Sequence, residues 1–329
     1  MKYFPSVSVI IPTYNRKDWV LDTLDSLSRQ TFSRDRYEVI LVDDGSNDGT
    51  TEIEGRSFPF DLHYIWQSNQ GDAAARNLGV QHSQADILVF LDDDILVEPD
   101  YLTCLIDEHE PHTDRFVVGT ERLWIEESNP LDVPHAPRIS GENHTTVEIP
   151  FADVCSNNMS LRRDAYYSIG MMEGLGFPGS DIWCDVDFAY RAYVKGFEFL
   201  RATQAVCYHR DYTARNLEQD AKRSEKAAYQ SVLLFQRYPD ILPHIPMYRD
   251  MTPIVWNQDP PELIVRKLAR HVASSRLALR SMRGMASILD RHYPSPILLR
   301  PLHRWVSGGY KFRGYRAGLR EFGPVGRLT

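Results

Sequence analysis

Short apolar runs alternate with helical patterns through the first hundred residues, and this alternation limits the possible folds more than any other feature. Four runs rich in β-branched residues have the length of strands; they are residues 6–11, 37–42, 62–66 and 86–91. Helical spacing follows the first run, and residues 73–82 also have a helical pattern. Strands and helices that alternate in this way predict an α/β fold with a mostly parallel, Rossmann-like sheet flanked by helices. Such sheets bind ligands at the carboxyl ends of their strands.

The pattern weakens between residues 110 and 150, where five prolines predict irregular loops that could form a substrate-facing insertion. Order returns over residues 151–210, with a helix expected at 185–194. Further helices are expected at 224–238 and 262–290, before a basic, glycine-rich tail. We therefore expect an α/β domain over residues 1–221 and a helical extension over 222–329.

Charge divides the chain at the same place. The 329 residues are 43% hydrophobic and 25% charged, which excludes disordered, collagen-like and coiled-coil classes. Residues 1–221 hold 18 basic and 38 acidic residues, a net charge of −20, whereas residues 222–329 hold 19 and 7, a net charge of +12. The asymmetry suggests an acidic part that needs cations and a basic part that could face an anionic surface.

Nothing in the sequence resembles a membrane span or a secretion signal. No run approaches the roughly 18 to 20 apolar residues that a span needs, and no apolar core precedes the first strand-like run. We therefore expect a cytoplasmic protein. Cys104, Cys155, Cys184 and Cys207 form no C-x-x-C pair, so we expect reduced thiols and neither a disulfide framework nor a structural zinc site.

Three consecutive carboxylates, Asp92, Asp93 and Asp94, follow the apolar run at residues 86–91. If strand alternation continued, Asp92 and Asp94 would point to one side and Asp93 to the other. A hard divalent cation would relieve the repulsion between two such carboxylates, and Mg²⁺ or Mn²⁺ bound in this way usually completes its shell with diphosphate oxygens. The alternative is a solvated turn that caps the next helix.

Another acidic cluster, V-D-D-G-S-N-D-G-T at residues 42–50, also follows a predicted strand. One of its carboxylates could accept a hydrogen bond from a nucleobase, while Gly45 allows a tight turn beside the base. Turn and helix-cap chemistry would explain the same residues without a ligand. Because both acidic clusters end strands of one sheet, we favour the ligand site.

Four motifs in this order resemble the family 2 glycosyltransferases of the GT-A fold. They are S-V-I-I-P-T-Y-N-R at residues 8–16, the acidic cluster at 42–50, N-Q-G at 69–71 leading into A-R-N-L-G at 75–79, and the D-x-D element at 92–94. The match covers about the first 210 residues. The resemblance implies a nucleotide-diphosphate sugar donor, Mg²⁺ or Mn²⁺, a nucleotide-sugar half at about 1–110 and an acceptor half at about 111–221.

The resemblance also implies which residues contact the donor: Pro12, Thr13, Tyr14, Asp44, Asn69, Arg76, Asp92 and Asp93. Residues 12–14 would line the base pocket, and Asp44 would accept a hydrogen bond from the base. Asn69 and Arg76 would hold the nucleoside or diphosphate, although a surface ion pair remains an alternative for Arg76. Asp92 and Asp93 would contact the ribose and the donor sugar.

The metal ligands implied by the resemblance are Asp94 and His209. His209 ends a short apolar run, about where family members often place a histidine that contacts the metal or the diphosphate. A purely structural role for this histidine remains an alternative.

Residues 179–191 resemble the family element E-D-x-D-L-x-x-R. The resemblance implies that Asp185 is the general base toward the acceptor hydroxyl, with Trp183, Cys184 and Asp187 on the acceptor side. Cys184 stands where glutamate is usual, which would remove an acceptor contact and leave the base intact. Capping of the following helix is the alternative role for Asp185 and Asp187.

Residues 262–329 combine apolar residues at roughly helical spacing with many arginines. This pattern is typical of a helix on an anionic membrane surface, so we expect a peripheral attachment to the inner face of the membrane as one role of the segment. Packing against the acidic half of the chain is the alternative. We do not expect nucleic acid as a partner, because no recognised binding motif accompanies the arginines.

Together these features predict an inverting glycosyltransferase that acts on a nucleotide-diphosphate sugar, with UDP as the default nucleotide. The acceptor would be the hydroxyl of a glycan, a lipid-linked molecule or another compound, in the synthesis of cell-surface polysaccharide or glycoconjugate. A sugar nucleotidyltransferase is one alternative, but it would carry a glycine-rich phosphate loop where this chain has P-T-Y-N-R. A non-catalytic nucleotide-sugar-binding protein on the same fold is the other.

Overall fold

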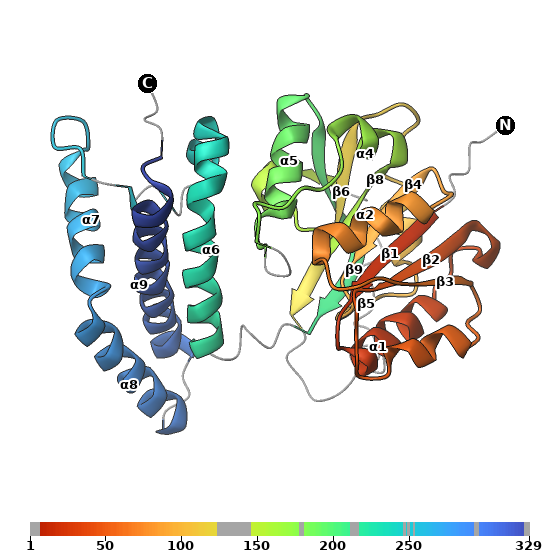
Figure 1. Ribbon diagram of the computed structural model, residues 1–329, viewed down its shortest axis with the longest axis horizontal. Coiled ribbons are helices and arrows are strands. Elements are labelled where there is room, and N and C mark those ends of the chain that lie inside the picture. The colour runs from red at the N-terminus through yellow and green to blue at the C-terminus, as the bar shows by residue number, and fades with distance from the viewer. Residues whose placement is uncertain are drawn as a thin grey trace. The chain divides into compact units, whose positions relative to one another are not determined.

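The chain forms two compact units, Met1–Asp211 and Tyr212–Thr329. The computed structural model in Figure 1 describes residues 7–123, 146–177, 181–210, 217–245, 248, 251–252, 254–292 and 296–325. The predicted boundary at residue 221 falls inside helix α6 (Leu217–Arg237), so the two units meet earlier in the chain than we expected.

The first unit is built on one sheet with the strand order β3-β2-β1-β4-β8-β6-β9-β5, and β7 pairs with β9. The four strands expected from the sequence form the parallel part: β1 (Val7–Thr13), β2 (Tyr37–Asp43), β3 (Asp61–Trp66) and β4 (Ile87–Leu91). The remaining strands form a mixed part: β5 (Ile95–Val97), β6 (Arg115–Leu123), β7 (Thr146–Glu148), β8 (Asn158–Arg162) and β9 (Glu198–His209).

Helices cover both faces of the sheet. Helices α1 (Lys17–Ser28) and α3 (Tyr101–Ile106) share a buried cluster with Val9 of β1. The opposite face carries α2 (Asp72–His82), α4 (Arg163–Ile169) and α5 (Cys184–Val194). Gly79 of α2 lies directly over Ile10, and Phe90 of β4 stacks on Tyr166 of α4 at 5.7 Å. With both faces covered, β1 and β4 are buried throughout, which is why they read as continuous apolar runs and confirms the predicted α/β fold class.

The segment expected to be irregular contains two strands. β6 and β7 lie within residues 110–150, and β6 pairs in parallel with β9 and antiparallel with β8. Three of the five prolines, Pro130, Pro134 and Pro137, lie outside the described residues. Short 3₁₀ helices complete the connections, at Arg34–Arg36, Thr50–Gly55, Phe151–Asp153 and Pro239–His244.

In the second unit, α6 packs against α9 (Pro296–Phe322). The helix expected over 262–290 is in fact two helices, α7 (Pro261–Ala273) and α8 (Arg276–His292). The break falls at two serines: the Ser274 hydroxyl donates back to the His271 carbonyl at 2.9 Å, and Ser275 Oγ accepts from the Ala278 N–H at 3.3 Å.

The expected glycine-rich tail is also helical. A Cβ atom at Gly314 or Gly318 would collide with the carbonyl oxygens of Glu225 and Tyr229, so these glycines allow α9 to approach α6 closely. None of the helices in the described part of the chain combines the length and the apolar character that crossing a membrane requires.

Candidate active site

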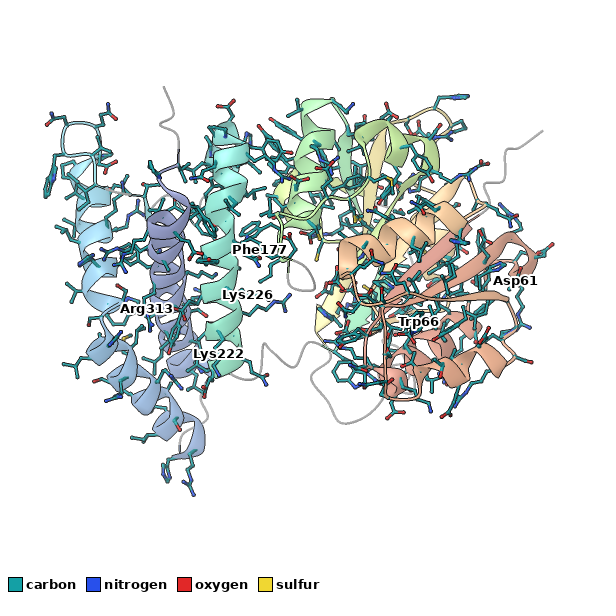
Figure 2. All side chains as sticks on the ribbon, viewed as in Figure 1. Asp61, Trp66, Phe177, Lys222, Lys226 and Arg313 are labelled. Carbon is teal, nitrogen blue, oxygen red and sulfur yellow. The ribbon has the colours of Figure 1, made fainter. Side chains whose placement is uncertain are left out.

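The candidate site lies where β1, β2 and β4 end. Thr13, the last residue of β1, pairs with Asp43, the last residue of β2, and Asp43 in turn pairs with Trp66 at the end of β3. Figure 2 shows Asp61 and Trp66 at opposite ends of β3, with Trp66 marking the carboxyl edge. Parallel neighbours thus bring the two acidic clusters to the same edge of the sheet.

The carboxylates at 92–94 do not follow strand alternation. β4 ends at Leu91, and the chain then turns, with the Ile95 N–H donating to the Asp92 carbonyl at 3.3 Å. Because these residues belong to a turn, Asp93 and Asp94 point to a common partner while Asp92 points to a different one. The predicted convergence is real, but it joins Asp93 with Asp94 instead of Asp92 with Asp94.

Arg16 is the shared partner. Its Nη1 donates to Asp93 Oδ1 at 3.0 Å and to Asp94 Oδ2 at 3.1 Å. The Thr13 hydroxyl donates to the other oxygen of Asp93 at 2.8 Å. Burial raises the pKa of Asp93 to about 7, although the positive charge of Arg16 lowers it. Repulsion from the Asp94 carboxylate adds to the increase. The Arg16 side chain is 47% exposed, so it lies between the two carboxylates and the solvent.

Asp94 also faces His209, because Ile95 pairs with His209 across β5 and β9. The His209 Nε2 lies 3.5 Å from Asp94 Oδ1, and its Nδ1 lies 2.9 Å from Glu121 Oε1. Burial opposes a charge on the imidazole, but the charges of Asp94 and Glu121 raise the pKa of His209 to about 10.

These two residues fit a divalent cation. Asp94 Oδ1 is buried and accepts no hydrogen bond, and it faces the imidazole of His209. The raised pKa keeps a proton on this imidazole, so a cation would have to displace that proton to use His209 as a ligand. Among the described residues no group of three or more His, Cys, Asp or Glu side chains is arranged as a complete ligand set. A sparse protein ligand set is what Mg²⁺ or Mn²⁺ uses when substrate phosphates supply the remaining oxygens.

The carboxylate of Asp44 anchors a loop. Its Oδ1 accepts from Gln67 Nε2 at 2.6 Å and from the Gln70 N–H at 2.8 Å, while its Oδ2 accepts from the Gly71 N–H at 2.8 Å. Asp44 is buried, so the predicted contact with a nucleobase would have to share oxygens that the loop already uses.

The other predicted base-pocket residues surround this loop. Pro12 is buried in β1, whereas Tyr14 and Asn69 are exposed. Gly45 has φ +88° and passes so close to the loop that a Cβ there would lie 2.9 Å from the Asn69 nitrogen. The two segments that carry the predicted nucleoside contacts therefore pack directly on each other.

Arg76 is a buried cation rather than a surface ion pair. Its Nη2 donates to Asp92 Oδ1 at 2.5 Å, and its buried Nε has no hydrogen-bond partner. Burial opposes the charge, but the Asp92 carboxylate raises the pKa of Arg76 above its ordinary value. A buried guanidinium with a donor to spare could hold a phosphate oxygen.

Asp185 lies in the first turn of α5, within the electrostatic influence of Arg76. Burial raises the pKa of its carboxylate. Hydrogen bonds from the Val186 N–H, the Cys155 thiol and the backbone of Ser156 lower this pKa, as does the charge of Arg76, but burial has the larger effect. Its Oδ1 accepts the Val186 N–H at 2.8 Å, which is a bond within the first helical turn. Asp185 as a whole residue is half-buried.

The other predicted acceptor-side residues are mostly interior. Trp183 and Cys184 are buried, and Asp187 is 0% exposed. Asp187 Oδ2 accepts from Arg191 Nε at 2.9 Å, and Arg191 also donates to the carbonyls of residues 169–171. Asp187 therefore offers no surface to an acceptor here. It pairs with Arg191, whose hydrogen bonds to the carbonyls fasten α5 to the end of α4.

Three site residues were not predicted from the sequence. Arg16 stands inside a quoted motif, but its contact with residues 77 and 78 positions away depends on the pairing of β1 with β4. Glu121 lies in the weakly patterned segment and has no sequence signal. Cys155 was predicted only as a reduced thiol; the structure places it, exposed, against Asp185.

The chain resembles known proteins in sequence and in fold. Residues 8–170 match Glycosyl transferase family 2. Over 96 residues the chain is 43% identical to the glycosyltransferase AglE of Haloferax volcanii, which covers 27% of this chain and 31% of that protein. It is 34% identical over 137 residues to the putative teichuronic acid biosynthesis glycosyltransferase TuaG of Bacillus subtilis, covering 40% of this chain and 54% of that protein.

The solved mannosyltransferase PcManGT of Pyrobaculum calidifontis, in complex with GDP-Man and Mn²⁺, superposes with a TM-score of 0.62 at 20% identity, over 97% of this chain and 88% of that one. This likeness shows the fold. The chain spans only about a third to half of the length of the curated relatives named above. The site motifs and the matched segment agree, and the chain belongs to glycosyl transferase family 2 through its first unit.

Proposed function

We propose that this protein is an inverting glycosyltransferase that moves a sugar from a nucleotide-diphosphate donor to an acceptor hydroxyl. One observation carries the proposal: the buried Arg76 binds Asp92 of the donor side and acts electrostatically on Asp185 of the acceptor side. A single guanidinium thus links the two carboxylates between which a donor phosphate and an acceptor hydroxyl would meet.

In the proposed step, Asp185 removes the proton of the acceptor hydroxyl as that oxygen attacks the anomeric carbon of the donor sugar. Its raised pKa makes it a better base than an ordinary surface carboxylate. Attack by the acceptor oxygen in a single displacement, opposite the departing nucleoside diphosphate, inverts the anomeric centre. A divalent cation held by Asp94 and His209 would compensate the charge of the leaving diphosphate. Arg76 would hold a diphosphate oxygen through its unpaired Nε.

UDP remains the default nucleotide, with dTDP and GDP as alternatives. The mannosyltransferase of similar fold was solved with GDP-Man and Mn²⁺, which supports including GDP-sugars and Mn²⁺ in a donor panel. The proposed pathway is the synthesis of cell-surface polysaccharide or glycoconjugate, and the similarity to a putative teichuronic acid glycosyltransferase supports it. A glycan, a lipid-linked molecule or another hydroxyl compound would be the acceptor.

The proposal includes an anionic membrane surface as a partner of residues 262–329. Several large apolar side chains are exposed along α7 and α8, and exposed apolar groups of this kind can mark a site of interaction. They are Val265, Leu268, Val272, Leu277, Met285 and Ile288. Basic residues of the same helices flank them, the pattern of a helix that lies at a lipid interface. Four free cysteines fit a reducing compartment, so we place this surface at the cytoplasmic face.

The decisive experiment is a donor panel scored by metal-dependent nucleotide release, with and without a membrane extract as the acceptor source. The variant Asp185→Asn should lose transfer to an acceptor while it still binds the donor, because only the base is removed. Asp61→Asn is the matched control, since Asp61 lies exposed at the far end of β3. Turnover by Asp185→Asn at the rate of the control would refute the assignment of the base.

The same panel separates the alternative functions. Release of pyrophosphate from a nucleoside triphosphate and a sugar phosphate would identify a nucleotidyltransferase. Donor binding with no nucleotide release under any metal or acceptor condition would identify a binding protein.

A further inference from the structure

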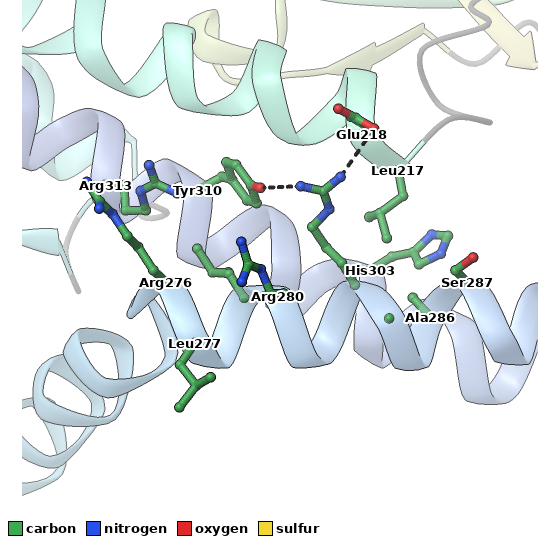
Figure 3. A pocket seen from close by; sticks show the side chains of 13 residues that line it. Leu217, Glu218, Arg276, Leu277, Arg280, Ala286, Ser287, His303, Tyr310 and Arg313 are labelled. Atoms are coloured by element: carbon green, nitrogen blue, oxygen red, sulfur yellow. Dashed lines mark hydrogen bonds and ion pairs between the residues drawn. The ribbon is translucent and has the colours of Figure 1, made fainter.

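The second unit contains a pocket of about 1060 Å³ that the proposed function does not use. Side chains of α6, α8 and α9 line it, and Figure 3 shows it from close by. The lining holds four guanidinium groups, those of Arg276, Arg280, Arg283 and Arg313, but a single carboxylate, Glu218. Positive charge therefore exceeds negative charge on the wall of a concave space, where it attracts anions.

Two of these arginines are held in place. Arg283 Nη1 donates to the Tyr310 hydroxyl at 3.0 Å, and its Nη2 lies 3.2 Å from Glu218 Oε2. The Arg313 guanidinium lies over the Tyr310 ring, 5.3 Å from its centroid. Tyr310 thus orients two guanidiniums at once, and little side-chain freedom would be lost when either of them binds a ligand.

The other two arginines are available. Arg276 and Arg280 are exposed, and neither forms a hydrogen bond or an ion pair with the described residues. Together with Arg283 they are spaced i, i+4 and i+7 on one face of α8. Figure 3 shows Arg276 and Arg280 extending from the same side of α8. Like charges at this spacing repel each other, and a bound anion would relieve that repulsion.

We propose that this pocket binds a phosphate or diphosphate group. Guanidinium groups pair with phosphate oxygens through two parallel N–H donors, and arginine is the residue best suited to this geometry. The pocket is large enough for a group that carries a further moiety, so the phosphate belongs either to a soluble phosphate compound or to the headgroup of a lipid. This is a discrete binding site, distinct from a diffuse attraction to a membrane surface, and it does not depend on the proposed transferase activity.

The test is a calorimetric titration of the full chain with inorganic pyrophosphate, in metal-free buffer at low ionic strength. The double variant Arg276→Ala/Arg280→Ala should bind at least about tenfold more weakly, because it loses charge-assisted hydrogen bonds. The matched control is Arg304→Ala/Arg320→Ala, which removes the same charge from exposed positions of α9 outside the pocket. The control should bind pyrophosphate nearly as well as the unaltered protein.

Two further variants and two vesicle preparations complete the test. Arg276→Lys/Arg280→Lys keeps the charge without the planar donors and should retain intermediate affinity. Vesicles of phosphatidylcholine with and without phosphatidate distinguish the sources: phosphatidate-dependent binding that only the pocket variant loses identifies a lipid headgroup. Pyrophosphate binding with vesicle binding unaffected by the pocket variant identifies a soluble phosphate compound. Equal losses in the pocket and control variants, or no pyrophosphate binding by the unaltered protein, would overturn the proposal.

Discussion

Two acidic clusters end the strands on either side of β1, and they differ in what their carboxylates contact. At Asp43 and Asp44, every carboxylate oxygen accepts a hydrogen bond from a neutral donor. These donors are the N–H groups of Ser46 and Gly71, the Tyr64 hydroxyl of β3 and the Gln67 amide. At residues 92–94, the carboxylates face Arg16, Arg76 and His209, and one buried oxygen of Asp94 has no hydrogen-bond partner. Similar residues at equivalent strand ends therefore have different surroundings.

The difference separates a scaffold from a binding site. Neutral donors from the backbone cannot leave without unfolding the loop, so the first cluster holds residues 67–71 in place. Charged side chains such as the half-exposed Arg16 can move aside when a cation or an anionic ligand arrives. We therefore expect substitutions in the first cluster to affect stability and substitutions in the second to affect chemistry.

The largest effect is expected for Asp94→Asn. If Asp94 holds the divalent cation, its loss removes several kcal/mol of charge stabilisation from the transition state, which corresponds to at least about 10³-fold in kcat. The measurement is metal-dependent transfer at saturating donor, together with thermal unfolding. The variant should remain folded. Its unfolding temperature should lie closer to that of the unaltered protein than the unfolding temperature of Asp44→Asn does. Activity within a few fold of the unaltered protein would remove Asp94 from the site.

The first cluster gives the opposite expectation. Asp44→Asn keeps the shape of the side chain but places an NH₂ group where the carboxylate now accepts backbone N–H bonds. Leaving one such buried donor unsatisfied costs about 1 to 3 kcal/mol in the free energy of unfolding, measurable by urea denaturation. If stability were unchanged while donor binding disappeared, Asp44 would serve the base and not the loop.

The sequence predicted the strand ends and the clusters but not this difference in contacts. The runs at β1, β2 and β4 are recognisable because burial on both faces requires continuous apolar residues. Alternation failed at residues 92–94 because β4 stops at Leu91 and a turn follows. The bond between Arg16 and Asp93 joins separate segments, and Glu121 meets His209 only because β6 lies beside β9. Such contacts depend on strand pairing, which periodicity along the chain does not contain.

An intermediate effect is expected for Arg16→Met, which keeps the length of the side chain and removes its charge. The guanidinium of Arg16 bridges Asp93 and Asp94. It would therefore compete with a divalent cation for Asp94. Its removal should tighten Mn²⁺ binding by roughly fivefold, which corresponds to about 1 kcal/mol for a half-exposed ion pair. The measurement is the unfolding temperature at increasing Mn²⁺ concentrations. This temperature rises when a ligand binds the folded state.

Arg16→Lys is the control for this competition. It keeps a positive charge near the two carboxylates, so its Mn²⁺ affinity should stay closer to that of the unaltered protein. If Arg16→Met bound Mn²⁺ no more tightly than Arg16→Lys, the guanidinium would not compete with the cation. The charged contacts of the second cluster would then not be replaced by a metal ion.

The smallest effect concerns Cys155, which donates its thiol hydrogen to Asp185 and so lowers the pKa of that carboxylate against the stronger effect of burial. A base acts only when deprotonated, so kcat is lost as pH falls through the pKa of Asp185. Cys155→Ala removes the donor and raises this pKa, so the acid limb of the kcat profile should move upward by about half a pH unit, as expected for a weak S–H donor. Cys155→Ser keeps a donor, and its limb should remain in place or move down. Coincident limbs for the alanine and serine variants would show that the base senses no hydrogen bond from this position. Asp185 would then resemble the first cluster, whose carboxylates have a structural role.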